Sequence, residues 1–215
     1  VLHGPGPGPG SALAEPPPLV SSSSPSKGRP IAERRRCRPG ETSAASSSSV
    51  AELVFAHLYG GVRFLHESNR NMPLEGEKNF KGLKKAYANG IELRGKTIGI
   101  IGFGRIGQEV AKIALGIGMN VVATDKYIDT AEVTVELFNG ESVDVSIYSV
   151  SMEEVLKTSD FISLHVPAQK EYVIGSKEFD MMKGGAAIIN AARGGVIDEV
   201  ALVNALYKNN LAFAA

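Results

Sequence analysis

The sequence predicts an α/β protein in which a parallel β-sheet carries helices on both faces. From Ser49 onward, short apolar runs rich in Val and Ile alternate with segments of helical periodicity. A glycine-rich turn joins the first of these runs directly to the helix that follows it. Strands that alternate with helices in this way are typical of a parallel sheet that is covered on both faces.

Residues 1–49 are predicted to form a disordered tail. Most of the prolines lie in this segment, together with two serine runs and a start of alternating Gly and Pro. Such a composition offers too little apolar surface to offset the entropy lost on ordering. The arginines around Cys37 could suggest a targeting sequence, but the prolines and the acidic residues Glu15, Glu33 and Glu41 argue against an amphipathic targeting helix.

A helix is expected over residues 50–67, followed by a long loop. Ser49 and Glu52 have the spacing of a capping box, and the apolar residues after them recur at helical intervals, although Gly60 and Gly61 weaken the pattern. Residues 68–95 are polar and predict a loop with room for one helical turn.

The next elements form a strand, a turn, a helix and a second strand. The buried strand is expected at Thr97–Ile101, the helix at residues 106–118 and the second strand at residues 121–124. Further along, the sequence predicts a helix at residues 152–157, strands at residues 161–165 and Ala186–Asn190, and a helix at residues 199–208 with Asp198 as its N-cap.

An inserted β-hairpin is expected after the second strand. Apolar residues alternate over residues 133–137 and 143–147, with Asn139 and Gly140 between them. A two-residue loop would place Val135 opposite Asp144, whereas a three-residue loop of residues 139–141 places Val135 opposite Val145. Since a slip of one residue moves every side chain to the other face, burial of the apolar residues favours the three-residue loop.

A dinucleotide-binding turn of the Rossmann type is predicted at Gly102, Gly104 and Gly107. The three glycines match the pattern GxGxxG, directly after an apolar strand and at the start of a helix. They permit a tight turn, close approach of the backbone to a pyrophosphate, and close packing of the helix on the strand. The N–H groups at the helix N-terminus would then face the phosphates. The alternative is a glycine turn that is packed without a ligand.

Asp125 indicates which dinucleotide would bind. It ends the second strand, where an acidic side chain accepts hydrogen bonds from the adenosine ribose and repels a 2′-phosphate. The pattern therefore favours NAD over NADP.

A second glycine motif, at residues 90–97, matches the P-loop pattern GxxxxGK[ST]. A P-loop follows a strand and opens a helix, whereas polar residues precede this motif and a strand follows it. Hydrolysis of a nucleoside triphosphate at Lys96 is therefore the weaker alternative.

Composition excludes several other classes of protein. The 23 basic and 23 acidic residues balance, which leaves no electrostatic signature of nucleic-acid or membrane binding. Cys37 is the single cysteine, so neither an intrachain disulfide nor a cysteine-based zinc site is possible. The four histidines lack metal-ligand spacing, and no apolar run is long enough to cross a bilayer. We expect a cytoplasmic protein without a metal site.

Four motifs in order resemble those of the D-isomer-specific 2-hydroxyacid dehydrogenases. They are the glycine turn at residues 102–107, Asp125, the run Ser163-Leu164-His165-Val166-Pro167 and the run Asn190-Ala191-Ala192-Arg193-Gly194-Gly195. The resemblance covers about residues 50–215, and within the family it is greatest to members that oxidise 3-phosphoglycerate. It implies an NAD domain at residues 96–215 that lacks its last part, and a helix and loop at residues 50–95 that lead from a substrate domain, most of which would be absent.

The resemblance also implies which residues contact NAD. The main chain of the glycine turn would hold the pyrophosphate, and residues after the later strands would line the cofactor cleft and the nicotinamide. The implied cofactor-binding residues are Gly102, Gly104, Arg105, Ile106, Gly107, Asp125, His165, Val166, Pro167, Ala191, Ala192 and Arg193. Residues 168–172 depart from the family, whose members commonly carry threonines here, one of which contacts the phosphates.

Arg193 is expected to be the catalytic residue. A guanidinium can bind a substrate carboxylate through two parallel hydrogen bonds and polarise the neighbouring carbonyl. The alternative is a structural ion pair with Asp198 or Glu199. His165 is interpreted as part of the cleft wall, because the family's acid–base histidine and its glutamate partner follow the arginine, and neither residue type occurs after Glu199.

The expected activity is reversible hydride transfer between NAD and C2 of a D-2-hydroxy acid or the matching 2-keto acid. The full-length protein is expected to be a homodimer that binds neither nucleic acid nor membrane. The alternative is a non-catalytic, NAD-responsive interaction protein on the same fold.

Overall fold

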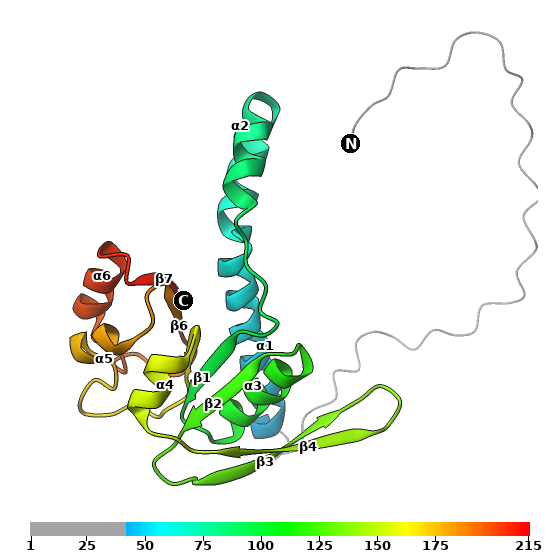
Figure 1. Cartoon of the computed structure of the whole chain (residues 1–215), viewed down its shortest axis with the longest axis vertical. Coiled ribbons are helices and arrows are strands. Elements are labelled where there is room, and N and C mark those ends of the chain that lie inside the picture. Colours follow the sequence, from blue (N-terminus) through cyan, green and yellow to red (C-terminus); the bar gives the residue numbers. More distant parts are fainter. Residues whose placement is uncertain (1–41) are drawn as a thin grey trace, which may run out of the picture. The chain divides into compact units, whose positions relative to one another are not determined.

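A computed structural model describes the backbone of residues 42–215 and the side chains of residues 46–215 (Figure 1). At its centre lies a five-stranded sheet with the order β2-β1-β5-β6-β7, in which every neighbouring pair is parallel. The strands are β1 (Thr97–Ile101), β2 (Asn120–Thr124), β5 (Phe161–Leu164), β6 (Ala186–Asn190) and β7 (Leu211–Ala214). The predicted parallel α/β fold is confirmed.

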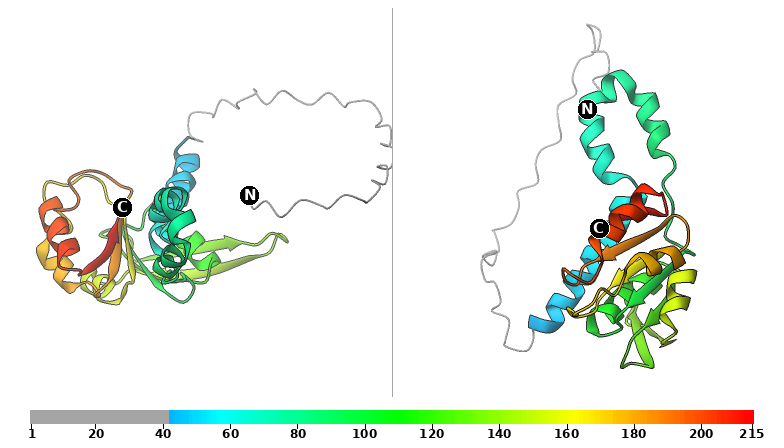
Figure 2. Two further views of the ribbon diagram at one scale, coloured as in Figure 1. Left: turned by 90° about the horizontal axis from the view of Figure 1, so that it is seen from above. Right: turned by 90° about the vertical axis from the view of Figure 1, so that its left-hand side faces the viewer.

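Helices cover both faces of the sheet (Figure 2). Ile98 and Ile100 of β1 pack in one core cluster with α1 (Thr42–Val62) and α3 (Arg105–Gly116). Ile162 and Leu164 of β5 point the other way, into a second cluster with the remaining helices. These are α4 (Met152–Thr158), α5 (Ser176–Met181) and α6 (Glu199–Tyr207). The continuous apolar strands are thus explained by burial on both sides.

A side-chain cap fixes the start of α6. The Asp198 carboxylate accepts hydrogen bonds from the backbone N–H groups of Val200 and Ala201, which confirms the predicted N-cap of α6.

The sequence did not predict the short helix α5 or the strand β7. Helix α5 has only six residues, and β7 has four, so neither carries a clear periodic pattern.

The region before β1 is more helical than expected. Helix α1 begins at Thr42, so the prediction of disorder is wrong for residues 42–49, while residues 1–41 lie outside the described part of the chain. Gly61 lies within α1, where a side chain would collide with the ring of Phe213 on β7. This glycine is therefore a point of close packing.

Helix α2 (Leu65–Tyr87) replaces the predicted loop over residues 68–87, while residues 88–95 are non-helical as expected. Phe64, in a left-handed conformation with φ of 53°, separates it from α1. Pro73 lies within α2, and the non-helical backbone of Asn79 kinks it into two segments. Helix α2 packs little apolar surface against the body, since Leu83 is its one buried residue.

Strands β3 (Thr130–Glu136) and β4 (Ser142–Tyr148) confirm the inserted hairpin but not its register. Val135 lies opposite Val143, not opposite Val145 as predicted. The loop does have three residues, but they are residues 138–140. Gly140, with φ of 85°, donates a hydrogen bond to the carbonyl of Leu137, as expected for a turn that ends in a left-handed glycine. The prediction failed because it ignored this requirement for glycine at the last loop position.

The base of the hairpin is fastened to the sheet. Ser149, directly after β4, forms a parallel bridge with Ala123 of β2. The Ser149 hydroxyl accepts a hydrogen bond from the backbone N–H of Asp125 at 3.0 Å. The end of the hairpin therefore lies beside the end of β2. Within the described residues, no helix combines the length and apolar character needed to cross a membrane.

Candidate functional site

A cleft of about 970 Å³ lies at the carboxyl ends of β1, β2 and β5. In open parallel sheets this edge is where ligands bind. The lining comes from the turn after β1, from the end of β2 and from the loop after β5. It includes Gly102, Gly104, Thr124, Asp125, Lys126, Tyr127, His165, Val166 and Pro167.

The three glycines of the turn meet different structural demands. Gly102 has φ of 95°, and a side chain on it would lie 2.7 Å from the carbonyl oxygen of His165. A side chain on Gly107 would collide with the carbonyl oxygen of Gly102, so this glycine lets α3 pack against the turn. Gly104 has φ of −71° and nothing within 4 Å of where a side chain would begin. The fold does not require glycine at this position.

Helix α3 begins at the cleft with its N-terminus uncapped by a side chain. Gly104 is the N-cap residue and provides no side-chain acceptor. Arg105 and Ile106 form the first turn and, with Gly104 and His165, line an adjoining cavity of about 230 Å³. An uncapped helix start of this kind can hold an anion through its N–H groups and its dipole.

Asp125 joins the glycine turn to the start of the hairpin. Its Oδ2 accepts a hydrogen bond from the N–H of Phe103 at 2.7 Å. Its Oδ1 accepts hydrogen bonds from the N–H groups of Tyr127 at 2.8 Å and Ile128 at 3.2 Å. Since a carboxylate offers about four acceptor positions, it can still accept a hydrogen bond from a ligand hydroxyl.

His165 lies at the end of β5, mostly buried. Its Nε2 is 2.8 Å from the hydroxyl oxygen of Ser163. Its Nδ1 is the one buried side-chain nitrogen or oxygen among residues 46–215 that lacks a hydrogen-bond partner. Burial lowers the pKa of His165 from 6.5 to about 4, so the ring is neutral at physiological pH. This agrees with a place in the cleft wall and not with a cationic general acid.

Arg193 follows β6 on the same edge of the sheet, but it is exposed and does not line the cleft. Its Nη1 donates a hydrogen bond to the carbonyl of Ala192 at 2.9 Å, and its own carbonyl accepts one from the Asn190 side chain. None of the ion pairs among residues 46–215 involves Arg193, and the Asp198 side chain caps α6. The alternative structural pairing with Asp198 or Glu199 is therefore not what the structure shows. Ala191 and Ala192 are half-buried beside it.

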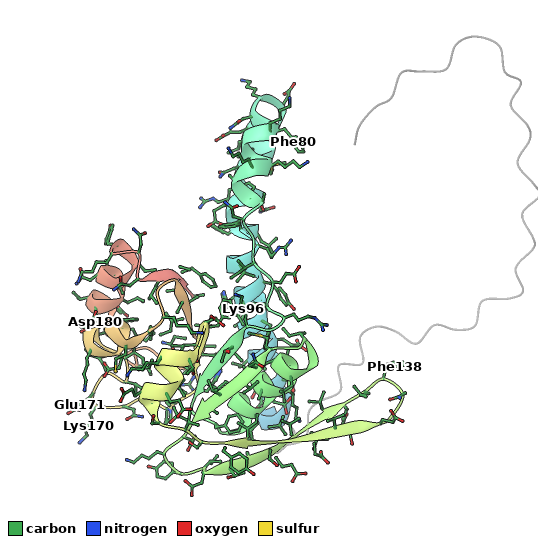
Figure 3. All side chains as sticks on the ribbon, viewed as in Figure 1. Phe80, Lys96, Phe138, Lys170, Glu171 and Asp180 are labelled. Atoms are coloured by element: carbon green, nitrogen blue, oxygen red, sulfur yellow. The ribbon has the colours of Figure 1, made fainter. Side chains whose placement is uncertain are left out.

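Sequence reasoning missed Lys126 and Tyr127, which line the cleft directly after Asp125. The Lys126 ammonium lies 5.7 Å from the centre of the Tyr127 ring. Their position next to the acidic residue was the available signal. The loop of residues 168–172 also lines the cleft, although Lys170 and Glu171 point away from the body of the protein in Figure 3.

The second glycine motif lies at the opposite end of β1. Lys96 precedes the strand, and no helix begins there (Figure 3). The N–H of Lys96 donates to the carbonyl of Leu93 within a turn. The P-loop interpretation is therefore wrong.

The residues of the cleft fit a dinucleotide. Gly104 leaves space for a phosphate beside the uncapped start of α3, and Asp125 offers an acceptor at the end of the neighbouring strand. Among residues 46–215, His, Cys, Asp and Glu side chains do not gather in groups of three that could hold a metal ion.

Comparison with known proteins agrees with this geometry. Residues 55–215 match the family model described as "D-isomer specific 2-hydroxyacid dehydrogenase, NAD binding domain". The chain is 41% identical over 173 residues to D-3-phosphoglycerate dehydrogenase of Methanocaldococcus jannaschii, covering 80% of this chain and 30% of that protein. It is 40% identical over 163 residues to hydroxypyruvate reductase of Thermotoga maritima, covering 75% and 47%.

The fold is similar to that of a solved NAD-dependent formate dehydrogenase from Staphylococcus aureus in complex with NAD. The TM-score is 0.62 and the identity 28%, over 78% of this chain and 46% of that one. The chain thus spans less than half the length of each of these three proteins.

Proposed function

The chain belongs to the D-isomer specific 2-hydroxyacid dehydrogenase family and contains its NAD-binding domain, and from that premise we propose that it serves reversible hydride transfer between NAD and C2 of a D-2-hydroxy acid. The observation that carries the proposal is the open position at Gly104. The fold would accept a side chain there, whereas a pyrophosphate lying against the turn would not.

The cleft residues divide the work of holding the cofactor. The main chain of Gly104, Arg105 and Ile106 would hold the pyrophosphate at the start of α3, while Gly102 and Gly107 shape the turn. Asp125, which lines the cleft, would accept hydrogen bonds from the adenosine ribose. His165, Val166 and Pro167 form the wall of the cleft, and Ala191 to Arg193, after β6 on the same edge of the sheet, would lie toward the nicotinamide.

Arg193 is the residue of this chain that we assign to the substrate. NAD held in the cleft would supply the nicotinamide ring that exchanges the hydride. The exposed guanidinium of Arg193 can turn from the Ala192 carbonyl to the carboxylate of a 2-hydroxy acid, where two parallel hydrogen bonds orient the substrate. Its permanent charge stabilises the oxygen on C2 as negative charge develops.

The substrate we propose is 3-phosphoglycerate, which would place the protein at the entry to serine biosynthesis. Support comes from the similarity to the Methanocaldococcus jannaschii protein named D-3-phosphoglycerate dehydrogenase. The similarity to the protein named hydroxypyruvate reductase makes hydroxypyruvate the competing candidate. We also propose a homodimer in the cytoplasm, as the family resemblance implies.

The proposal is tested by measuring NAD binding in variants of Gly104 and Gly116, two glycines at which the fold leaves room for a side chain. Gly104→Val should abolish NAD binding measured by calorimetric titration, because the new side chain occupies the space for the phosphate. Gly116→Val is the matched control, since Gly116 lies at the other end of α3 and also has nothing within 4 Å. Unchanged NAD affinity in Gly104→Val would refute the proposed site.

A further inference from the structure

The turn after β6 carries Arg193 and contains two successive glycines. It begins at Asn190, the last residue of β6, and the glycines follow Arg193 directly. Gly195 has φ of 77°, and nothing lies within 4 Å of where a side chain on Gly194 would begin. Because glycine loses more conformational freedom on folding than any other residue, such a turn is costly to hold in one conformation. A fixed position for Arg193 therefore requires further bonds within the turn.

The side chain of Asn190 provides two such bonds. Its Oδ1 accepts a hydrogen bond from the backbone N–H of Ala192 at 3.1 Å, and its Nδ2 donates one to the backbone carbonyl of Arg193 at 2.9 Å. One amide group thus binds both ends of the Ala192–Arg193 dipeptide. An aspartate of the same size accepts hydrogen bonds but cannot donate one when it is ionised, so the pair of bonds requires asparagine.

The base of this turn is fixed to the sheet. The backbone N–H of Asn190 donates a hydrogen bond to the carbonyl of Ala215, directly after β7, at 2.8 Å. Ala191 is half-buried and packs against the core cluster that contains α1 and α3. The amide of Asn190 therefore connects the ordered end of the sheet to the residue that carries the guanidinium.

The guanidinium of Arg193 lies on the same turn. Its Nη1 donates a hydrogen bond to the Ala192 carbonyl at 2.9 Å, and the side chain is exposed. When the backbone is held by Asn190, a substrate carboxylate can replace that carbonyl after rotation of the side chain alone. Without the two bonds from Asn190, the backbone must be ordered as well, and this adds to the entropy that is lost on binding.

We propose that Asn190 is a positioning residue, whose amide fixes the backbone of Arg193 so that the guanidinium meets the substrate carboxylate in a productive orientation. This inference rests on the proposed function, in which Arg193 binds the substrate. A guanidinium forms two parallel hydrogen bonds to a carboxylate only when the two planar groups are aligned. A displacement of about 1 Å in such a group can lower the rate by about 100-fold. In this role Asn190 acts through Arg193 and not on the reacting atoms.

A double-mutant cycle in the longer chain that extends beyond Ala215 tests this role. Oxidation of NADH with 3-phosphohydroxypyruvate is compared in Asn190→Ala, in Arg193→Ala and in the variant that carries both changes. Asn190→Ala should lower kcat/KM for the keto acid by about 10- to 100-fold, because the guanidinium is no longer held in place. The double variant should be no slower than Arg193→Ala alone, since a residue that acts through a guanidinium has no effect once that guanidinium is absent.

The KM for NADH separates positioning from general damage to the cleft. Asn190 does not line the cleft, so Asn190→Ala should leave this KM unchanged. Asn190→Asp should lower kcat/KM as well, because it keeps the acceptor for Ala192 and loses the donor to Arg193.

Asn139→Ala is the matched control. In the hairpin loop, the Oδ1 of Asn139 also accepts a hydrogen bond from the N–H two residues later, that of Glu141, at 3.1 Å. Its Nδ2 donates a hydrogen bond to the Glu141 carboxylate at 2.9 Å. The control therefore removes an equivalent pair of bonds away from Arg193, and it should leave kcat/KM unchanged.

The other outcomes separate this inference from the proposed function. If Arg193→Ala keeps full activity, Arg193 does not bind the substrate, and the role of Asn190 fails with it. If Arg193→Ala loses activity and Asn190→Ala does not, the proposed function stands and the inference is wrong. If the two losses multiply in the double variant, Asn190 acts independently of Arg193 and the inference is also wrong. A rise in the KM for NADH as large as the loss in kcat/KM would likewise overturn it.

Discussion

At the scale of single residues, the pKa of His165 connects the cleft wall to the stability of the fold. Burial lowers this pKa to about 4, whereas the unfolded chain binds a proton below about pH 6.5. The contribution of His165 to the free energy of unfolding is therefore complete above pH 6.5 and is lost as the pH falls toward 4, by about 1.4 kcal/mol per pH unit.

This sign can be measured by urea unfolding. Between pH 7 and pH 5 the free energy of unfolding should fall by about 2 kcal/mol more in the unmodified chain than in a His165→Leu variant. The variant has no imidazole at this position to take up a proton on unfolding. Every other residue is the same in both proteins, so contributions from elsewhere in the chain cancel in the difference. Equal losses in the two proteins would show that His165 titrates normally in the folded state.

Asp125 provides a second prediction at this scale, on the choice of cofactor. Asp125→Ala should narrow the preference for NAD over NADP by about tenfold, or about 1.4 kcal/mol, because the charge that repels a 2′-phosphate is removed. The variant also loses the acceptor for three backbone N–H groups and should be less stable. The ratio of the two affinities, titrated in the same protein, is independent of that loss. A preference that does not change would contradict the assignment.

Sequence located the glycine turn and Asp125 because their roles depend on position along the chain. It could not show that Asp125 is held by Phe103, Tyr127 and Ile128, or that the Nδ1 atom of His165 is buried without a partner. Both facts arise from packing between segments distant in sequence. Arg193 was placed on the correct edge, but its side-chain direction in the structure was not predictable.

At the scale of elements, the hairpin register offers a covalent test. In a chain with Cys37→Ser, the pair Thr134→Cys and Asp144→Cys should form a disulfide, because these residues lie directly opposite each other. Thr134→Cys with Ser146→Cys is the control, since that pair would be opposite in the register expected from the sequence. Mass spectrometry after mild oxidation distinguishes them. A disulfide formed only by the control pair would show that the strands pair in the register expected from the sequence.

Elements were predictable where burial imposes a pattern. The strands β1, β2, β5 and β6 and the helices α3, α4 and α6 pack on both sides of the sheet, so their apolar residues recur regularly. Helix α2 packs against little, and its polar sequence therefore looks like a loop. In the hairpin, the apolar faces were identified correctly, while the conformation required at Gly140 decided the register.

At the scale of the whole molecule, the 215-residue chain should bind NADH but reduce 2-keto acids no faster than background. The oxygen on C2 must receive a proton, and a positioned acid contributes about 10² to 10⁴ in rate. Arg193 is a poor proton donor, and His165 is neutral and buried. Oxidation of NADH followed by absorbance, with 3-phosphohydroxypyruvate and glyoxylate as substrates, provides the measurement.

A longer chain that extends beyond Ala215 is the comparison for this prediction. It should be active, and Arg193→Ala should then remove most of its activity. Rapid turnover by the 215-residue chain itself would contradict the prediction and make His165 the leading acid–base residue.

The fastening of the hairpin base beside Asp125 has a thermodynamic consequence. The Asp125 backbone N–H donates a hydrogen bond to the Ser149 hydroxyl. The Asp125 carboxylate accepts hydrogen bonds from Phe103 in the glycine turn and from Tyr127 in the segment that leads to the hairpin. Displacement of the hairpin base therefore acts on the same carboxylate that we assign to the adenosine ribose. By thermodynamic linkage, the factor by which a displacement of the hairpin base changes cofactor affinity equals the factor by which bound cofactor changes the equilibrium of that displacement, since the two equilibria close a single cycle.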